Sequence, residues 1–306
     1  MAPAWTNISY KDWTESCDTL HAHTQVLGKL SVALAPAEPQ LQHAALRLTA
    51  RGWETAPLPT PDGSGTLVVV LDLRVHEVVI EASHGGVRRV ALTPHRPVGA
   101  VTRETLSAVG SLVGPVHIDP KPQEVPWNVP LDEDDEHARY DERQVGEYFA
   151  AATQASLVLA AFRAPYRGRS TPVNAWWGSF DLAVSLFSGL PAEPPSRDFI
   201  LRNAMDAQEV AIGWWPGDPR YGKAAFYAYA HPAREGFADA TLSPASARWD
   251  TALGEYVLDW DDVCQSADPR GTGLAFAHSA FRHACQVCEW DMSLLASVEG
   301  RPPPVV

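Results

Sequence analysis

Apolar residues recur at helical spacing in several long stretches of this chain. Residues 10–35 contain no internal proline, place leucines on one face from Leu20 to Leu34, and are followed by Pro36. This pattern predicts a helix that ends at the proline. By the same spacing we expect further helices at 98–113, 142–166 and 272–297.

Shorter stretches, rich in β-branched residues and bounded by turn residues, predict strands. In the first half they are 43–52, 66–75, 77–83 and 87–93, with a hairpin turn at 84–86 and a short strand at 116–122. In the second half they lie near 172–187, 208–215, 224–230 and 246–258. The order of elements predicts an α+β fold of two similar halves, each a mostly antiparallel sheet flanked by helices.

A proline-rich and then acidic segment, residues 119–141, separates these halves. We expect it to be a connector between an N-terminal half at 1–118 and a C-terminal half at 142–298. Residues 299–306 have the composition of a disordered tail. Two packed halves would favour a small-molecule site between them.

The net charge of the chain limits the classes of partner that it is expected to bind. Its 306 residues carry 37 acidic and 24 basic side chains, a net charge of −13. Such a field repels nucleic acid and anionic membrane surfaces, so a small-molecule ligand is the expected partner. No apolar run approaches the ~20 residues of a membrane span, and the first residues lack a signal peptide pattern. We expect a cytoplasmic protein with four reduced cysteines.

Two polar patterns are candidates for acid–base chemistry. His21, Gln25 and Lys29 are spaced i, i+4, i+8 and share one stripe of the first helix. His137 follows five carboxylates and precedes Tyr140. Nearby negative charge favours imidazolium, so His137 is a candidate general acid. A half-buried polar face and a solvated acidic loop are the alternative interpretations.

Two tryptophan pairs predict an aromatic wall. Side chains alternate along a strand, so one tryptophan of each pair would face the core and the other the opposite surface. We expect a pocket in which aromatic walls surround a few polar groups; its members are Asn174, Trp176, Trp177, Asp181, Gln208, Glu209, Trp214, Trp215, Tyr227 and Tyr229. Aromatic packing inside a sheet core is the alternative.

Several common motifs are absent. The chain has no P-loop, no G-x-G-x-x-G, no H-E-x-x-H and no G-x-S-x-G sequence, so no nucleotide cofactor motif is present. Cys285 and Cys288 form a single C-x2-C pair in a helical stretch. This spacing favours core packing of the two thiols over a zinc site.

With these residues in view, the chain resembles a bacterial family of unknown function, family 5996. The similarity is carried by 19–29, 46–59, 137–141, 166–189, 213–218, 225–240 and 253–263. The resemblance implies that His21, His43 and His137 match family histidines, and that typical members have histidine at Asn174 and Gln208. Five histidines would imply a metal centre, whereas carboxamides bind transition metals poorly and suit a polar ligand. The chain is therefore expected to be a divergent member with a specialised substrate.

Three functions follow as hypotheses. The first is a small-molecule enzyme, a lyase or isomerase, with His21 and His137 as acid–base groups, Asp181 and Glu209 as carboxylates, and Gln25, Lys29 and Tyr140 joining the pocket residues in substrate binding. The second is a metal-dependent oxidoreductase or related enzyme that holds iron or zinc at His21, His43 and His137. The third is a non-catalytic ligand-binding protein.

Overall fold

The computed structural model describes residues 5–294, which divide into two compact units. The N-terminal unit is formed by Ser9–Ala150 and Asn174–Asp181, and the C-terminal unit by the described residues of 1–8, 151–173 and 182–306. Each unit holds one antiparallel sheet with helices, which confirms the predicted α+β class. Residues 119–141, expected as a connector, lie within the N-terminal unit.

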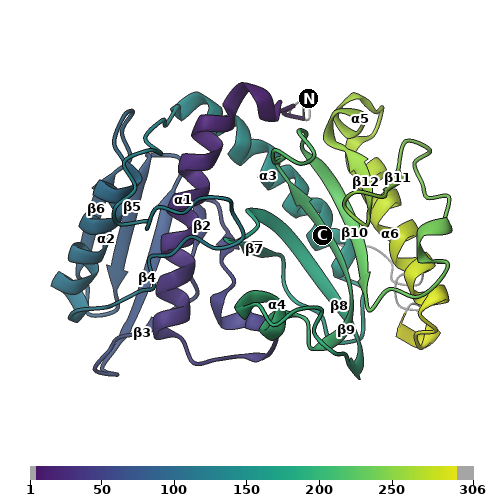
Figure 1. Ribbon diagram of the computed structural model, residues 1–306, viewed down its shortest axis with the longest axis horizontal. Coiled ribbons are helices and arrows are strands. Elements are labelled where there is room, and N and C mark those ends of the chain that lie inside the picture. Colours follow the sequence, from purple (N-terminus) through teal and green to yellow (C-terminus); the bar gives the residue numbers. More distant parts are fainter. Residues whose placement is uncertain (1–4, 295–306) are drawn as a thin grey trace, which may run out of the picture. The chain divides into compact units, whose positions relative to one another are not determined.

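The sheet of the N-terminal unit has the strand order β1-β2-β4-β5-β6, and β3 pairs with β4. Its strands are β1 (Arg47–Leu48), β2 (Gly52–Glu54), β3 (Leu58–Pro59), β4 (Thr66–Asp72), β5 (Glu77–Ala82) and β6 (Val87–Ala91). Helix α1 (Tyr10–Leu34) runs across this sheet, and α2 (Val98–Val113) packs on β5 and β6 (Figure 1). The 3-10 helix η1 (Pro39–Ala44) follows α1.

Both predicted helices of this unit are confirmed. Helix α1 ends one residue before the extended Ala35, as expected from Pro36. The strand predicted at 116–122 is wrong, because this segment has no regular structure. It contains Pro120 and Pro122, which cannot donate to a sheet. The side chain of Gln25 instead holds the neighbouring backbone, as described below.

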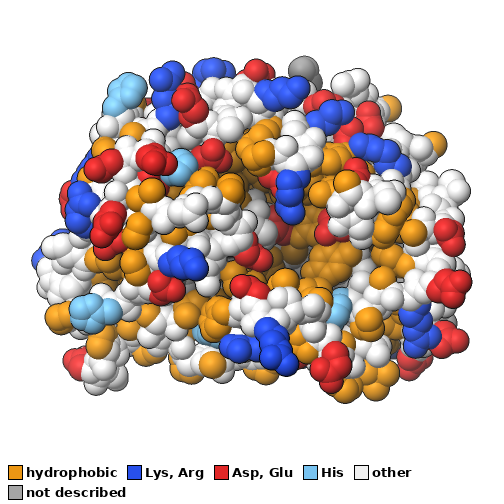
Figure 2. Space-filling view, viewed as in Figure 1, with side chains coloured by type: hydrophobic (Ala, Val, Ile, Leu, Met, Phe, Trp, Pro, Cys, Tyr) orange, Lys and Arg blue, Asp and Glu red, His pale blue; other side chains and the backbone are white. Residues whose placement is uncertain are grey.

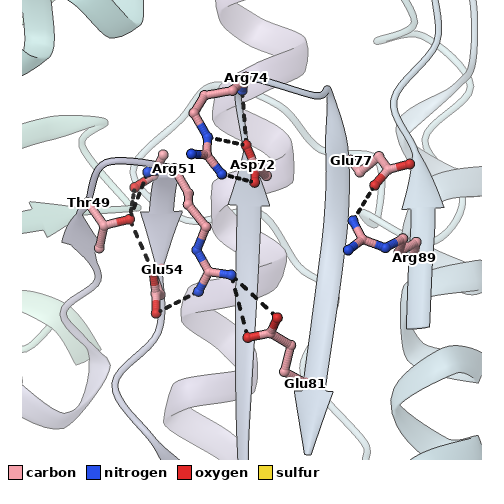
Figure 3. A network of polar contacts seen from close by, with 9 residues as sticks. Thr49, Arg51, Glu54, Asp72, Arg74, Glu77, Glu81 and Arg89 are labelled. Atoms are coloured by element: carbon pink, nitrogen blue, oxygen red, sulfur yellow. Dashed lines mark hydrogen bonds and ion pairs between the residues drawn. The ribbon is translucent and has the colours of Figure 1, made fainter. Parts of the chain in front are cut away.

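One face of this sheet carries a network of ion pairs (Figure 3). Arg51 Nη2 lies 3.2 Å from Glu54 Oε1, and Arg51 Nη1 lies 3.5 Å from Glu81 Oε1. Further pairs join Arg74 to Asp72 and Arg89 to Glu77. Asp72 is buried, whereas the other side chains of these pairs are partly or fully exposed and contribute little to stability.

The strands of the C-terminal unit are hydrogen-bonded in the order β11-β12-β10-β9-β8. They are β8 (Asp181–Pro191), β9 (Ala207–Trp215), β10 (Ala225–His231), β11 (Arg248–Asp250) and β12 (Glu255–Asp259). The helices are α4 (Phe199–Ala204), η2 (Phe237–Asp239), α5 (Trp260–Gln265), α6 (Pro269–Val287) and η3 (Met292–Leu294). Helix α3 (Glu142–Arg163) gives its first turns to the N-terminal unit and the remainder to this one.

One face of this sheet packs against helices and forms the core. Phe226 lies 6.5 Å from Phe276 of α6, measured between ring centroids, and a Cβ on Gly273 of α6 would lie 3.2 Å from the Phe226 ring. Trp214, opposite Phe226 in the strand register, is fully buried and contacts Trp260. By alternation, Trp215 points to the other face of the sheet.

Three elements predicted for the C-terminal half have different boundaries in the structure. The stretch 172–187 is not one strand: β7 (Asn174–Trp176) ends in a turn at 177–180, where Phe180 has φ 56°, and β8 then begins. The stretch 246–258 is split by a turn ending at Gly254, whose φ is 72°. The final helix begins at Pro269 and ends at Val287. Residues 295–297 and the predicted tail at 299–306 lie outside the described residues.

Helix α3 is the one helix among residues 5–294 that is long and apolar enough to cross a membrane by length and composition. That property is also common in core helices. Tyr148 and Phe162 of this helix are 1% exposed, and each packs on aromatic side chains of its own unit. The packing is that of a core helix.

Candidate functional site

His21 is buried on α1 and has a defined tautomer. Its Nε2 lies 2.9 Å from the carbonyl oxygen of Trp177 and 3.0 Å from that of Gly178, so Nε2–H donates to both. The imidazole stacks on Phe180 with 4.9 Å between centroids. Burial lowers the pKa of His21 to about 4, so the ring is neutral. His21 therefore stabilises the turn at 177–180.

His137 is held by a carboxylate in the segment that follows. Its Nδ1 lies 2.7 Å from Oδ2 of Asp134, which is 2% exposed and also accepts the backbone N–H groups of Glu136 and His137 at 3.0 Å. This hydrogen bond raises the pKa of His137. Burial alone would raise the pKa of Asp134, but the hydrogen bonds from His137 prevail and lower it. The pair is an ionised carboxylate that orients an imidazole.

The indole of Trp127 contacts both His21 and His137. Its centroid lies 5.2 Å from the His21 ring and 4.4 Å from the His137 ring. Asp18 is one helical turn before His21; burial raises its pKa, and His137 opposes this effect. We call Asp18, His21, Trp127, Asp134 and His137 the histidine cluster. Within residues 5–294, Nε2 of His137 has no hydrogen-bond partner.

The amides predicted to bind substrate are used inside the protein. Gln25 Nε2 donates to the carbonyl oxygen of Gln123 at 2.9 Å, and Gln25 Oε1 accepts the Gln123 N–H at 2.9 Å. Asn174 is 1% exposed, donates to Gln42 Oε1 at 3.1 Å and accepts from Arg47. Both carboxamides hold loop segments in place.

Other predicted residues of the N-terminal unit also have structural contacts. Trp177 Nε1 donates to Ala44 O at 3.1 Å, and its ring lies so close to Gly28 that a Cβ there would be 2.1 Å away. The ammonium of Lys29 is 5.5 Å from the Trp177 ring centroid, and burial lowers its pKa. The remaining three are the half-buried Trp176, Tyr140, whose hydroxyl is 3.0 Å from His76 Nδ1, and Asp181, which accepts from Ser179.

The predicted metal site at His21, His43 and His137 is not formed. His43 Nδ1 accepts the backbone N–H of Glu38 at 3.0 Å, within the turn at η1. Across residues 5–294 no group of three or more His, Cys, Asp or Glu side chains is placed to hold a metal ion. The donors predicted from the sequence are directed to the backbone and to Asp134 instead, so the metal hypothesis is corrected here.

The C-terminal unit brings the second set of predicted residues together. In the strand register Tyr227 lies opposite Gly213 and His231 opposite Glu209, so these residues share with Trp215 the face that points away from α6. Hydrophobic side chains gather over β8, β9 and β10 in Figure 2. We call Trp215, Tyr227, Tyr229 and Glu209 the aromatic strip. Gln208 is on the other face, where it accepts from Ser188 Oγ at 3.1 Å.

Glu209 is the titratable member of this strip. It is 4% exposed, and burial raises the pKa of its carboxyl to about 7. The hydroxyls of Ser185 and Tyr229 donate to it and limit this shift, whereas Asp206 increases it. A carboxyl with this pKa can exchange a proton near neutral pH.

Sequence reasoning missed several residues of these groups and their neighbours, among them Asp18, Trp127, Asp134 and Ser185. Two of them had a signal in the spacing, because Asp18 precedes His21 by three residues and Asp134 precedes His137 by three. Trp127 and Ser185 had none, because Trp127 contacts His21 and Ser185 contacts Glu209 across long stretches of sequence.

Comparison with known proteins gives a family and no function. No curated protein and no solved structure matches this chain. The model of one family matches residues 5–297, and that family is described as a family of unknown function (DUF5996). The resemblance expected from the sequence segments is confirmed.

Proposed function

The chain belongs to the family of unknown function DUF5996, and we propose that it is a small-molecule enzyme whose acid–base group is His137. The observation that carries this proposal is the Asp134–His137 pair beside Trp127. A carboxylate that is itself held by two backbone N–H groups fixes the imidazole, and it leaves Nε2 without a partner among the described residues.

The tautomer determines which atom reacts. Because Nδ1–H donates to ionised Asp134, Nε2 is the nitrogen that gives or takes a proton. The raised pKa of His137 favours the protonated ring, so His137 acts as a general acid in the forward step and as a base once deprotonated. Such a group typically contributes about 10²–10⁴ in rate. His21 is neutral and donates to two carbonyls, so it positions the site rather than transferring protons.

Trp127 and Asp18 define the surroundings of the reacting nitrogen. The indole packs against the imidazole at 4.4 Å between ring centroids and offers a flat surface to a ligand. Asp18 is a second carboxyl near His137, and burial raises its pKa. This set suits an elimination or isomerisation of a small organic molecule. The acidic charge of −13 favours a cytoplasmic enzyme that acts on neither nucleic acid nor membranes.

The test is a comparison of substrate turnover between matched variants. The full chain, His137→Gln and His117→Gln are each incubated with a bacterial small-molecule extract, and untargeted mass spectrometry records which compounds disappear and which form. His117 is exposed and serves as the control histidine from the same segment. We expect the unaltered chain and His117→Gln to convert the same compound, and His137→Gln to be slower by about 10²-fold or more.

Two outcomes would contradict the proposal. Equal conversion by His137→Gln would exclude this histidine as the acid–base group. If the unaltered chain converts nothing yet retains a compound through gel filtration, the protein binds ligands without catalysis. Thermal unfolding of each variant is measured alongside, so that loss of fold is not taken for loss of chemistry.

A further inference from the structure

The aromatic strip of the C-terminal unit forms a continuous ladder of rings. Trp215 and Tyr227 lie 5.5 Å apart between centroids with their planes at 63°, and Tyr227 and Tyr229 lie 6.2 Å apart with their planes at 3°. Tyr221 extends the ladder beyond Trp215, at 5.3 Å. At the other end the Tyr229 hydroxyl lies 3.5 Å from Glu209 Oε1. Aromatic faces arranged in this way favour flat, apolar ligands.

Glycine at position 213 shapes the middle of this ladder. A Cβ on Gly213 would lie 2.2 Å from Cζ of Tyr227, which is far inside van der Waals contact. The Tyr227 ring therefore lies directly over the backbone of β9. Any larger residue at 213 would displace the ring, so the glycine is required for the position of the Tyr227 ring.

One polar atom of the strip has no partner. Trp215 is 8% exposed, and its Nε1–H makes no hydrogen bond with any of the described residues. A buried N–H without an acceptor is unfavourable, because it has lost its hydrogen bond to water. Trp215 belongs to the face that points away from α6, so a ligand bound at that face would supply the acceptor that this N–H lacks.

The carboxylate of Asp259, near Trp215, is already paired with two cations. Asp259 Oδ2 lies 2.9 Å from Lys223 Nζ, its Oδ1 lies 3.1 Å from Arg248 Nη2, and it also accepts from the Tyr221 hydroxyl. Asp250 and Asp261 add further negative charge close to this group. This excess of negative charge disfavours an anionic ligand, and the cations that surround Asp259 leave it unsuited to binding an amine.

We propose that the aromatic strip is a binding site for a neutral, flat aromatic molecule with a carbonyl oxygen. The ring system lies parallel to Tyr227 and at an angle to Trp215, and the carbonyl accepts the hydrogen bond from Trp215 Nε1. The site is made entirely by residues of the C-terminal unit, so it does not depend on the histidine cluster or on the proposed catalysis.

The first experiment uses 2-naphthamide as the probe and the full chain with ¹⁵N-labelled tryptophan. The Trp215 indole N–H signal, assigned by its loss in Trp215→Phe, is expected to shift to lower field and to saturate as the probe is added. Trp13 is the matched control, because its buried Nε1 also has no partner but lies in the N-terminal unit. Its signal is expected to stay in place. A Trp215 signal that does not move would overturn the proposal.

Affinities then separate the hydrogen bond from the stacking. Trp215→Phe keeps a ring and removes the N–H, and we expect its Kd for 2-naphthamide to rise about tenfold. Cyclohexanecarboxamide has the carbonyl without the flat ring and is expected to bind at least about tenfold more weakly than 2-naphthamide. Equal affinity in either comparison would contradict the proposal.

Two more variants keep the test decisive. Gly213→Ala moves the Tyr227 ring and should weaken binding even if Trp215→Phe fails to fold, so unchanged affinity in Gly213→Ala would also contradict the site. His137→Gln should bind 2-naphthamide with the affinity of the unaltered chain. A loss of binding in His137→Gln would show that the probe occupies the histidine cluster instead.

Discussion

At the scale of single residues, the neighbours of each histidine decide its charge. His21 and His137 both lie against Trp127, yet burial keeps the first neutral while Asp134 favours the charged form of the second. The sequence-based expectation of an acid–base pair treated the two rings as equivalent. Their hydrogen bonds make one a positioning residue and the other the candidate catalytic residue.

The depressed pKa of His21 has a consequence for acid stability. An unfolded histidine titrates near 6.5, whereas folded His21 titrates at about 4. Between these values the unfolded state binds more protons, so stability falls as the pH is lowered from 6.5 to 4. The full difference corresponds to about 3 kcal/mol. We expect urea unfolding of His21→Gln to show a smaller loss of stability between pH 7 and pH 4.5 than the unaltered chain.

His23 provides the comparison for this test, because burial also lowers its pKa to about 4. His23→Gln should reduce the acid sensitivity by a similar amount, and the double variant should reduce it by nearly the sum. If neither substitution changes how strongly stability falls with pH, the folded protein does not depress the pKa of either imidazole.

Glu209 predicts the opposite pH dependence. Its folded pKa of about 7 exceeds the ordinary value of 4.5, so the folded state holds the proton longer than the unfolded state. Stability therefore falls as the pH rises from 4.5 to 7, by about 3 kcal/mol in all. Glu209→Gln keeps the shape and removes the titration, so we expect it to be more stable than the unaltered chain at pH 8. Urea unfolding of Glu209→Gln and of the unaltered chain is measured at pH 5 and pH 8. If the stability of the two proteins changes equally between these pH values, Glu209 is not a buried carboxyl that keeps its proton in the folded state.

At the scale of elements, the pattern of apolar residues predicted most helices and strands. Helix α2 has the predicted bounds and α1 differs by one residue, because both bury a regular apolar stripe. The predicted strand at 172–187 was wrong because the chain turns at Phe180, which adopts a positive φ that the apolar pattern does not reveal. The Phe180 ring is buried between His21 and Trp53, and these contacts stabilise the turn. Both partners are distant in sequence, so the local pattern does not predict them.

The candidate site was predictable where it depends on local spacing. Asp134 and His137 are three residues apart, so their pairing could be found in the sequence. Gln25 and Asn174 were predicted to face a ligand, but their partners are Gln123, Gln42 and Arg47, at separations that spacing rules do not cover. A polar residue on an apolar stripe indicates burial, and only the fold tells whether protein or ligand satisfies it.

Gln25 makes a testable prediction about the segment that carries the histidine cluster. Its amide is fully buried and makes two hydrogen bonds to the backbone of Gln123. Gln25→Met keeps the length and removes both bonds, leaving the Gln123 N–H and carbonyl without partners. We expect a loss of about 2–4 kcal/mol in unfolding free energy and faster hydrogen exchange of the Gln123 amide. His117→Gln, in the same segment, should change neither quantity; unaltered exchange at Gln123 in Gln25→Met would contradict the role of the amide.

At the scale of the whole molecule, the two compact units do not follow the order of the chain. The N-terminal unit includes residues 174–181, which follow helix α3 in the chain. The C-terminal unit includes residues 5–8, which precede helix α1. The sequence predicted a division at 119–141 because prolines and charges cluster there. Compactness depends instead on which segments complete each core, and composition does not report that.

This arrangement predicts which fragments can fold. Phe180 stacks on Trp53 and Tyr148 at 5.3 and 5.2 Å, and Trp53 Nε1 donates to the Tyr148 hydroxyl at 3.0 Å. A fragment of residues 9–141 lacks both Phe180 and Tyr148. Each missing core aromatic costs about 3–5 kcal/mol, and together they approach the whole stability of a typical domain.

We therefore expect residues 9–141 to remain unfolded, and a chain of 9–150 joined to 174–181 by a Gly/Ser linker as long as the omitted segment to fold. Near-ultraviolet circular dichroism and cooperative urea unfolding distinguish the two, since only packed aromatic side chains give a fixed near-ultraviolet signal. Substituting Phe180→Ala in the longer chain should abolish that signal or shift its urea midpoint strongly downward. Cooperative unfolding of 9–141 would mean that the aromatic stack on Phe180 is dispensable, and that the predicted boundary at 119–141 divides the chain as well as the observed units do.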